Sequence, residues 1–313
     1  MHLNFLPVLS QKKTLIILSF IAIYVFWGST YLWNKMAVTE LPPFMIGGMR
    51  FCTAGLLIFG LAAALGHSLR ISWKQLGNSI LAGILFLSVG NGVFVWALKY
   101  IDSGFGSLIA SMYPLFTILI MMLVQKRKLK KMTVFGVVLG LCGMILLVSQ
   151  RELAVEPNFW LGVGLAVTAI FSWSCGSLMV AQVDTPKNHF VSTAYQMTAA
   201  GLILILASLV IGEEWSSPLN WQSRTQIAML CLVFFGSIAA FSAFNYLLKN
   251  VATEKVTTSA YVNPVIALFL GWYFLGEKIT LQSGIAAAIL ITGVYFINTG
   301  RSKNKAENER LGK

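Results

Sequence analysis

The chain has 313 residues, of which 57% are hydrophobic and only 11% are charged, with a mean hydropathy of +0.76. A soluble domain usually carries about 25% charged residues, so this composition excludes an ordinary soluble protein and indicates a chain embedded in lipid. The net charge of +12 does not indicate a nucleic-acid partner, because the basic residues lie in short segments beside apolar runs, where they set membrane topology.

Ten apolar segments approach the roughly 20 residues that a helix needs to cross a bilayer. They are residues 14–36, 43–65, 77–98, 103–124, 132–149, 159–181, 190–211, 226–248, 256–275 and 281–299. The first run is long, lacks a small-residue cleavage site and is followed directly by a second span, so we interpret it as a membrane span and not as a signal peptide. Residues 1–13 are expected to form a cytoplasmic N-terminus, and the polar residues 300–313 a disordered cytoplasmic tail.

The charges between the spans predict the orientation. Most of the 23 Lys and Arg residues fall in one set of loops together with both termini, whereas most of the 11 acidic residues fall in the opposite set. Cytoplasmic loops of membrane proteins carry an excess of Lys and Arg. The pattern therefore predicts a multi-pass protein with both termini in the cytoplasm.

The two halves of the chain share residues at constant spacing. Trp27 and Trp173 are 146 residues apart, whereas Pro114 recurs as Pro264 after 150 residues. The spacing changes once, in a polar stretch, as a loop insertion would produce. Because each half holds five predicted spans, the second half enters the membrane from the opposite side. The predicted fold is an all-α membrane protein of ten transmembrane helices in two inverted five-helix repeats, residues 14–149 and 159–299, a plan typical of transporters.

The sequence shows no catalytic or metal-binding pattern. Its three His residues lie far apart, its four Cys residues are isolated in apolar runs, and no acidic residue lies in the middle of a predicted span. We therefore expect no enzymatic activity, no cofactor and no metal. The sequence also offers no candidate for the carboxylate that usually relays protons in a coupled pump.

Arg50 is the one charge well inside a predicted span. One interpretation is a cavity charge that binds an anion or anchors the structure. The other is snorkelling, because the outer end of the span is about 10 Å of helix away, within partial reach of the side chain. Its partner in the second half is Gln196, which is polar but uncharged.

Two prolines, Pro114 and Pro264, lie in the fourth predicted span of each half. Proline removes a hydrogen bond from the preceding turn, and a freed carbonyl at membrane depth must face protein or a wet cavity. We expect each proline to form a hinge beside a substrate path. A static kink that aids packing is the alternative.

Polar and aromatic side chains at helical spacing are the candidate substrate-binding residues. They are Trp27, Ser29, Thr30, Tyr31, Asn91, Tyr113, Trp173, Ser177, Phe241, Asn245, Tyr261 and Asn263. Hydroxyl and amide side chains in a span often bond only to neighbouring helices. The asparagines are the stronger candidates, because an unpaired amide in hydrocarbon costs several kcal/mol.

Several motifs together resemble a known family. They are FWGSTY (26–31), MRF (49–51), VGNG (89–92), SMYPLFT (111–117), FGSI (235–238) and AYVNPVIALFLGWYFLGEKIT (260–280). These stretches resemble the drug/metabolite transporter superfamily, specifically the EamA-type exporters of bacterial inner membranes. The resemblance covers residues 14–299 and implies ten helices, cytoplasmic termini and a central cavity used by alternating access. The second half departs from the pattern in the sixth span of the chain, where Trp173 is followed by Ser-Cys-Gly-Ser.

The expected function is therefore the export of small amphipathic metabolites, amino acids or related compounds, across the inner membrane. The expected partners are this small-molecule substrate and the lipid bilayer, with no nucleic acid and no obligate protein partner. A nucleotide-sugar or sugar-phosphate carrier is the alternative within the transporter class. A channel or a membrane enzyme are the alternatives outside it.

Overall fold

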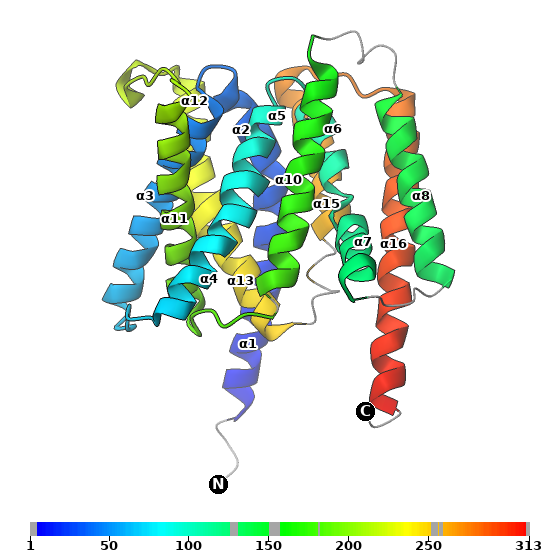
Figure 1. Ribbon diagram of the computed structural model, residues 1–313, viewed down its shortest axis with the longest axis horizontal. Helices are drawn as coiled ribbons and strands as arrows, with labels where there is room; N and C mark the ends of the chain where they lie inside the picture. Colours follow the sequence, from blue (N-terminus) through cyan, green and yellow to red (C-terminus); the bar gives the residue numbers. More distant parts are fainter. Residues whose placement is uncertain are drawn as a thin grey trace.

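The computed structural model describes residues 5–125, 131–149, 157–180, 182–251, 256 and 259–310, and every regular element within these ranges is helical (Figure 1). In the first half the elements are α1 (Phe5–Ile21), η1 (Ala22–Phe26), α2 (Trp27–Val38), α3 (Pro43–Ala64), α4 (Trp73–Gly83), η2 (Ile84–Val93), α5 (Phe94–Ala97), α6 (Ser103–Ala110), α7 (Tyr113–Gln125) and α8 (Lys131–Val148). In the second half they are α10 (Phe159–Val180), α11 (His189–Val210), η3 (Pro218–Asn220), α12 (Ser223–Cys231), η4 (Leu232–Ala239), α13 (Ala240–Asn250), α15 (Ser259–Leu275) and α16 (Leu281–Arg310).

Within the described residues, seven helical segments are long and apolar enough to cross a membrane, by length and composition. They are Lys12–Val38, Pro43–Ala64, Trp73–Ala97, Ser103–Met121, Phe159–Val180, His189–Val210 and Ser223–Leu247. Three shorter apolar helices are Lys131–Leu147, Val262–Leu275 and Leu281–Gly293. Large apolar side chains such as Leu56, Leu206 and Tyr273 are exposed on the outside of the bundle, as lipid contact requires. The predicted class of an all-α membrane protein is confirmed.

Three spans contain a π-helical stretch within an otherwise α-helical course. The stretch η1 lies between α1 and α2, η2 between α4 and α5, and η4 between α12 and α13. Such turns depart from the usual i→i+4 hydrogen-bond pattern and occur frequently at functional sites. With the 150-residue spacing, η2 and η4 overlap, so the same irregularity recurs at equivalent places in the two halves.

Helices at equivalent positions of the two halves pack against each other. The pairs α3–α11 and α8–α16 form the most extensive contacts in the bundle. In Figure 1, α1 enters the bundle at the end where α16 leaves it, whereas α10 begins at the opposite end. The first spans of the two halves therefore run in opposite directions.

Two helix N-termini on the same end of the bundle are capped by carboxylates from distant loops. Glu213 accepts hydrogen bonds from two backbone amides in the first turn of α3, at 3.1 and 2.8 Å. Glu277 does the same for the first two amides of α6, at 2.8 and 3.0 Å. Each glutamate follows a glycine with positive φ, Gly212 (74°) or Gly276 (68°), a conformation common just after the end of a helix. The dipole of the capped helix stabilises a carboxylate at its N-terminus. These contacts join the two halves.

Two predictions about the fold are corrected. The span predicted over 103–124 is broken at Ser111 and Met112, and Pro114 is the second residue of α7. A proline is tolerated there because the first helical amides have no intrahelical partner. Pro264, in contrast, lies inside α15. The tail predicted to be disordered from residue 300 is helical through Arg310, because it is rich in Lys, Arg and Glu and extends an existing helix. Residues 311–313 lie outside the described part.

The α3–α11 contact depends on small residues, which leads to a prediction about stability. A Cβ atom added to Gly201 would lie 2.5 Å from the backbone nitrogen of Cys52 on α3. We expect Gly201→Ala to lower the free energy of unfolding by about 1–3 kcal/mol, the usual cost of overpacking. Gly60→Ala on α3 is the matched control, because nothing lies within 4 Å of its added Cβ. Thermal unfolding of the purified variants checks this, and equal melting temperatures for the two would contradict the close packing.

Candidate functional site

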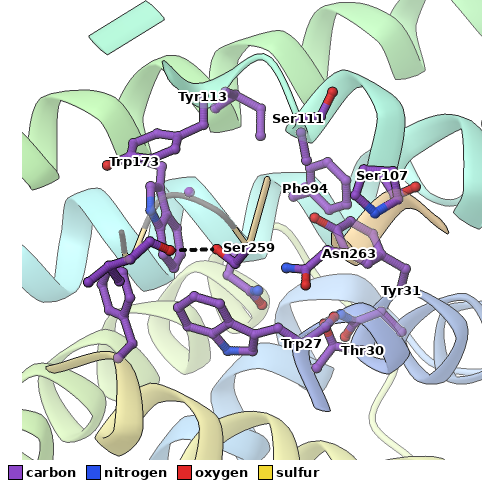
Figure 2. A pocket seen from close by; sticks show the side chains of 18 of the residues that line it. Trp27, Thr30, Tyr31, Phe94, Ser107, Ser111, Tyr113, Trp173, Ser259 and Asn263 are labelled. Atoms are coloured by element: carbon purple, nitrogen blue, oxygen red, sulfur yellow. Dashed lines mark hydrogen bonds between the residues drawn. The ribbon is translucent and has the colours of Figure 1, made fainter. Parts of the chain in front are cut away.

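A cavity lies at the centre of the bundle between the two halves (Figure 2). Its empty space, including the part open to the surroundings, is about 990 Å³. The first half contributes α2, α3, η2, α5, α6 and α7, and the second contributes α10, α13, α15 and Val256. The lining residues are Trp27, Thr30, Tyr31, Asn34, Arg50, Gly90, Asn91, Phe94, Ser107, Ala110, Ser111, Tyr113, Ile170, Trp173, Phe244, Val256, Ser259, Asn263 and Pro264.

Nine of the predicted site and hinge residues line this cavity. They are Trp27, Thr30, Tyr31, Arg50, Asn91, Tyr113, Trp173, Asn263 and Pro264. The labelled side chains in Figure 2 converge on one space from several helices. The structure therefore brings together residues that lie more than 200 positions apart in the sequence.

Four predicted binding residues do not line the cavity. Ser29 and Ser177 donate to the carbonyls of the preceding helical turn, at 2.8 and 3.0 Å. Phe241 is fully buried in the core. Asn245 donates through Nδ2 to Thr193 Oγ1 on α11 at 2.7 Å. Its amide therefore joins two helices and has its hydrogen-bond partner within the protein. The side chain of Tyr261 lies outside the described part of the structure.

The remaining lining residues fall into groups that the sequence could have indicated. Phe94 and Phe244 are equivalent residues of the two halves at the 150-residue spacing. Ser259 lies one helical turn before Asn263, and its hydroxyl donates to the carbonyl of Val256 at 3.2 Å, the dashed contact in Figure 2. Asn34 lies on the same face of α2 as Trp27 and Tyr31. The others are small residues from η2, from α6 and from the turn after α6, together with the apolar Ile170 and Val256.

The guanidinium of Arg50 points into the protein. Its side chain is only 3% exposed. Nε donates to Ser237 Oγ on η4 at 2.7 Å, and Nη1 lies 3.3 Å from Asn91 Oδ1 and 3.5 Å from Asn34 Oδ1. The snorkelling interpretation is therefore wrong, because the side chain reaches partners in both halves instead of the membrane surface.

Aromatic rings form another wall of the cavity. The Trp27 ring packs edge-on against Trp173, with centroids 5.9 Å apart, and lies 4.9 Å from the Phe244 ring. Trp27 Nε1 also donates to the carbonyl of Gly236 in η4 at 3.3 Å. This hydrogen bond sets the orientation of the indole, so Trp27 presents a fixed apolar face to the cavity.

Asn263 connects α15 to the π-helical stretch of the first span. The surrounding acceptors orient its amide so that Nδ2 lies 3.1 Å from the carbonyl oxygens of both Ile23 and Tyr24 and 3.3 Å from that of Ser259. Both Ile23 and Tyr24 belong to η1. Because Asn263 also lines the cavity, one side chain couples the wall of the site to the contact between the two halves.

The side chains that line the cavity are suited to binding a solute and not to catalysis. Among the lining residues in the described part of the chain, Arg50 is the only charged one. Ser107 and Ser111 donate to carbonyls of α6, at 2.6 and 2.7 Å, so their oxygens are left as acceptors. The described residues contain no cluster of three His, Cys, Asp or Glu side chains that would hold a metal ion.

Comparison with known proteins identifies the relatives of this chain. Residues 14–149 and 160–299 each match the model of the EamA-like transporter family. The chain is 34% identical over 283 residues to the inner membrane transporter YedA of Escherichia coli strain K12, covering 90% of this chain and 89% of YedA. The predicted family is confirmed.

More distant relatives extend the comparison. The chain is 22% identical to the transporter YoaV of Bacillus subtilis strain 168, over 91% of this chain and 96% of YoaV. It is 24% identical to an Escherichia coli K12 protein named "Probable amino-acid metabolite efflux pump", over 91% of this chain and 95% of that protein. A protein of known crystal structure shares the fold with a TM-score of 0.65 at 21% identity, over 91% and 96% of the two chains. The matched family and YedA are transporters, which confirms that the chain is not an enzyme.

Proposed function

Because this chain belongs to the EamA-like transporter family, we propose that it exports small amphipathic metabolites, amino acids or related compounds, across the inner membrane. In this proposal ten helices form two inverted five-helix repeats, and the central cavity opens alternately to the two sides. Both termini lie in the cytoplasm, in agreement with the excess of basic residues in the loops on their side. The protein acts without an obligate protein partner.

The cavity between the halves is the observation that carries the proposal. Both repeats contribute to its lining, so a movement of one repeat against the other changes access to the bound solute, as in transporters built from repeats. The opposite directions of α1 and α10 (Figure 1) support inversion. The pairing of α3 with α11 and of α8 with α16 supports the internal symmetry. Pro264, inside α15 and in the cavity wall, is the proposed hinge.

The composition of the lining supports an amphipathic solute. Trp27, Trp173 and Phe244 offer apolar and aromatic contact, whereas Asn91 and Asn263 orient polar groups. A nucleotide-sugar carrier would need several cations for its phosphates, and Arg50 is the only charged residue among the described lining residues. The name of one relative, "Probable amino-acid metabolite efflux pump", agrees with this substrate class.

Reconstitution of the purified protein alone into proteoliposomes tests the function. Amino acids, polyamines and toxic amines are first screened for an increase of the melting temperature, and the solutes that stabilise the protein are then measured for counterflow. We expect at least one amphipathic amino acid to exchange in a saturable manner. Single-channel currents in a planar bilayer would instead support a channel, and no solute flux at all would contradict the proposal.

The same vesicles determine the coupling. Since no acidic residue lines the cavity in the described part of the chain, we propose facilitated transport. Transport that continues after the proton gradient is dissipated supports this. Transport that stops would show proton antiport.

A further inference from the structure

We propose that Arg50 binds the anionic group of the transported solute, and that the solutes are carboxylates with an apolar body. This inference rests on the proposed transport function and makes its substrate class more specific. It starts from a charge that the described part of the fold buries without a counter-ion.

The described partners of Arg50 are all neutral. Ser237, Asn34 and Asn91 each accept one hydrogen bond from the guanidinium, which has five N–H donors. No described residue supplies a carboxylate to it, and the side chain is almost completely buried. A buried ion without a counter-ion is costly, and neutral acceptors offset only part of the cost. An incoming anion would complete the pairing.

The surrounding residues hold the guanidinium in place for such a ligand. A Cβ atom on Gly236 would lie 2.8 Å from Thr30 Cγ2 and 3.0 Å from Nη2 of Arg50, so the backbone of η4 packs directly against the guanidinium and restrains it. The three acceptors use Nε and Nη1 and leave Nη2 for a ligand. The two asparagines turn their Oδ1 atoms toward Arg50, which leaves their Nδ2 groups as further donors. Arginine pairs with a carboxylate through two parallel hydrogen bonds, a geometry that a fixed guanidinium favours.

The positions of the charge and the aromatic rings indicate the shape of the solute. Trp27 Nε1 donates to the carbonyl of Gly236 at 3.3 Å, and a Cβ atom on the same glycine would lie 3.0 Å from Nη2 of Arg50. Both Trp27 and Arg50 line the cavity. The cavity thus places the cation and the aromatic wall next to each other. A single carboxylate with an apolar or aromatic body fits this arrangement, whereas a dianionic phosphate would carry more charge than one cation balances.

Binding of three probes with the same skeleton to the purified full-length protein tests the inference. The probes are 3-phenylpropanoate, its neutral amide 3-phenylpropanamide and the cationic 3-phenylpropylamine. Tryptophan fluorescence and melting temperature report binding. We expect the carboxylate to bind at least tenfold more tightly than the amide. Arg50→Gln should abolish this preference, and Arg50→Lys should keep part of it. Arg224→Gln, which removes an exposed arginine at the start of α12, should leave it unchanged.

The outcomes separate this inference from the proposed function. Equal affinities of the wild-type protein for the carboxylate and the amide would overturn the inference, and this comparison needs no variant to fold. A preference that survives Arg50→Gln, or no binding of any of the three probes, would also overturn it. If the proteoliposomes still exchange another solute in these cases, the proposed transport function remains and only the inference about Arg50 fails. If they exchange no solute, the transporter proposal fails as well.

Discussion

Replacing Asn263 with alanine is expected to lower transport at least tenfold. The change removes the amide that bonds to the carbonyls of Ile23 and Tyr24 in η1 and to that of Ser259. Buried acceptors that lose their donor cost about 1–3 kcal/mol, and here the loss falls on the contact between α15 and the first span, in the wall of the cavity. Solute counterflow per folded protein in proteoliposomes measures the effect.

Asn245→Ala is the matched control for this change. Asn245 is also a buried asparagine with an interhelical hydrogen bond, to Thr193 Oγ1, but it does not line the cavity. We expect Asn245→Ala to lower the melting temperature and to leave transport per folded molecule near the wild-type value. Wild-type transport by Asn263→Ala, or the same loss in both variants, would show that Asn263 has no special place in the site.

Helical periodicity was sufficient to predict one wall of the cavity. Thr30, Tyr31 and Asn34 lie three, four and seven residues after Trp27, on the same face of α2, and all four line the cavity. Ser29 is two residues from Trp27, about 200° around the helix, and its side chain bonds to its own helix instead. The spacing within one span therefore distinguished the residues that face the cavity from the others more reliably than polarity did.

Periodicity could not show which helix a polar residue faces. Asn245 and Asn263 are equally polar and lie in apolar spans, yet one joins α13 to α11 and the other borders the cavity. The π-helical stretches were equally beyond prediction, because no residue type requires them. The partners of Asn263 depend on η1, so its contacts follow from the packing of α15 on the first span and not from its own sequence motif.

The two halves share a scaffold but contribute unequally to the site. Arg50 lines the cavity, whereas its repeat partner Gln196 is buried in α11 and donates to Ser192 Oγ at 3.0 Å. Likewise η1 has no π-helical counterpart in α10. The repeated sequence predicted paired helices, but the differences between repeat partners determine where the charge and the polar groups lie.

Trp27→Ala is expected to reduce transport at least tenfold with a smaller effect on folding. Trp27 presents its indole to the cavity, contacts Trp173 and Phe244, and bonds to the carbonyl of Gly236. Alanine removes the apolar surface against which the body of the solute packs. The cost in stability should lie below the roughly 3–5 kcal/mol of a fully buried Trp→Ala change, because Trp27 is only half-buried.

Intermediate substitutions separate the two roles of Trp27. Trp27→Phe keeps an aromatic face but loses the N–H group that bonds to Gly236, so we expect transport between that of the wild type and Trp27→Ala. Trp73→Ala is the control, because Trp73 is 88% exposed at the start of α4 and should be dispensable for transport. Counterflow and melting temperature are measured for all three variants. Wild-type counterflow by a folded Trp27→Ala protein would exclude the indole of Trp27 from the binding site.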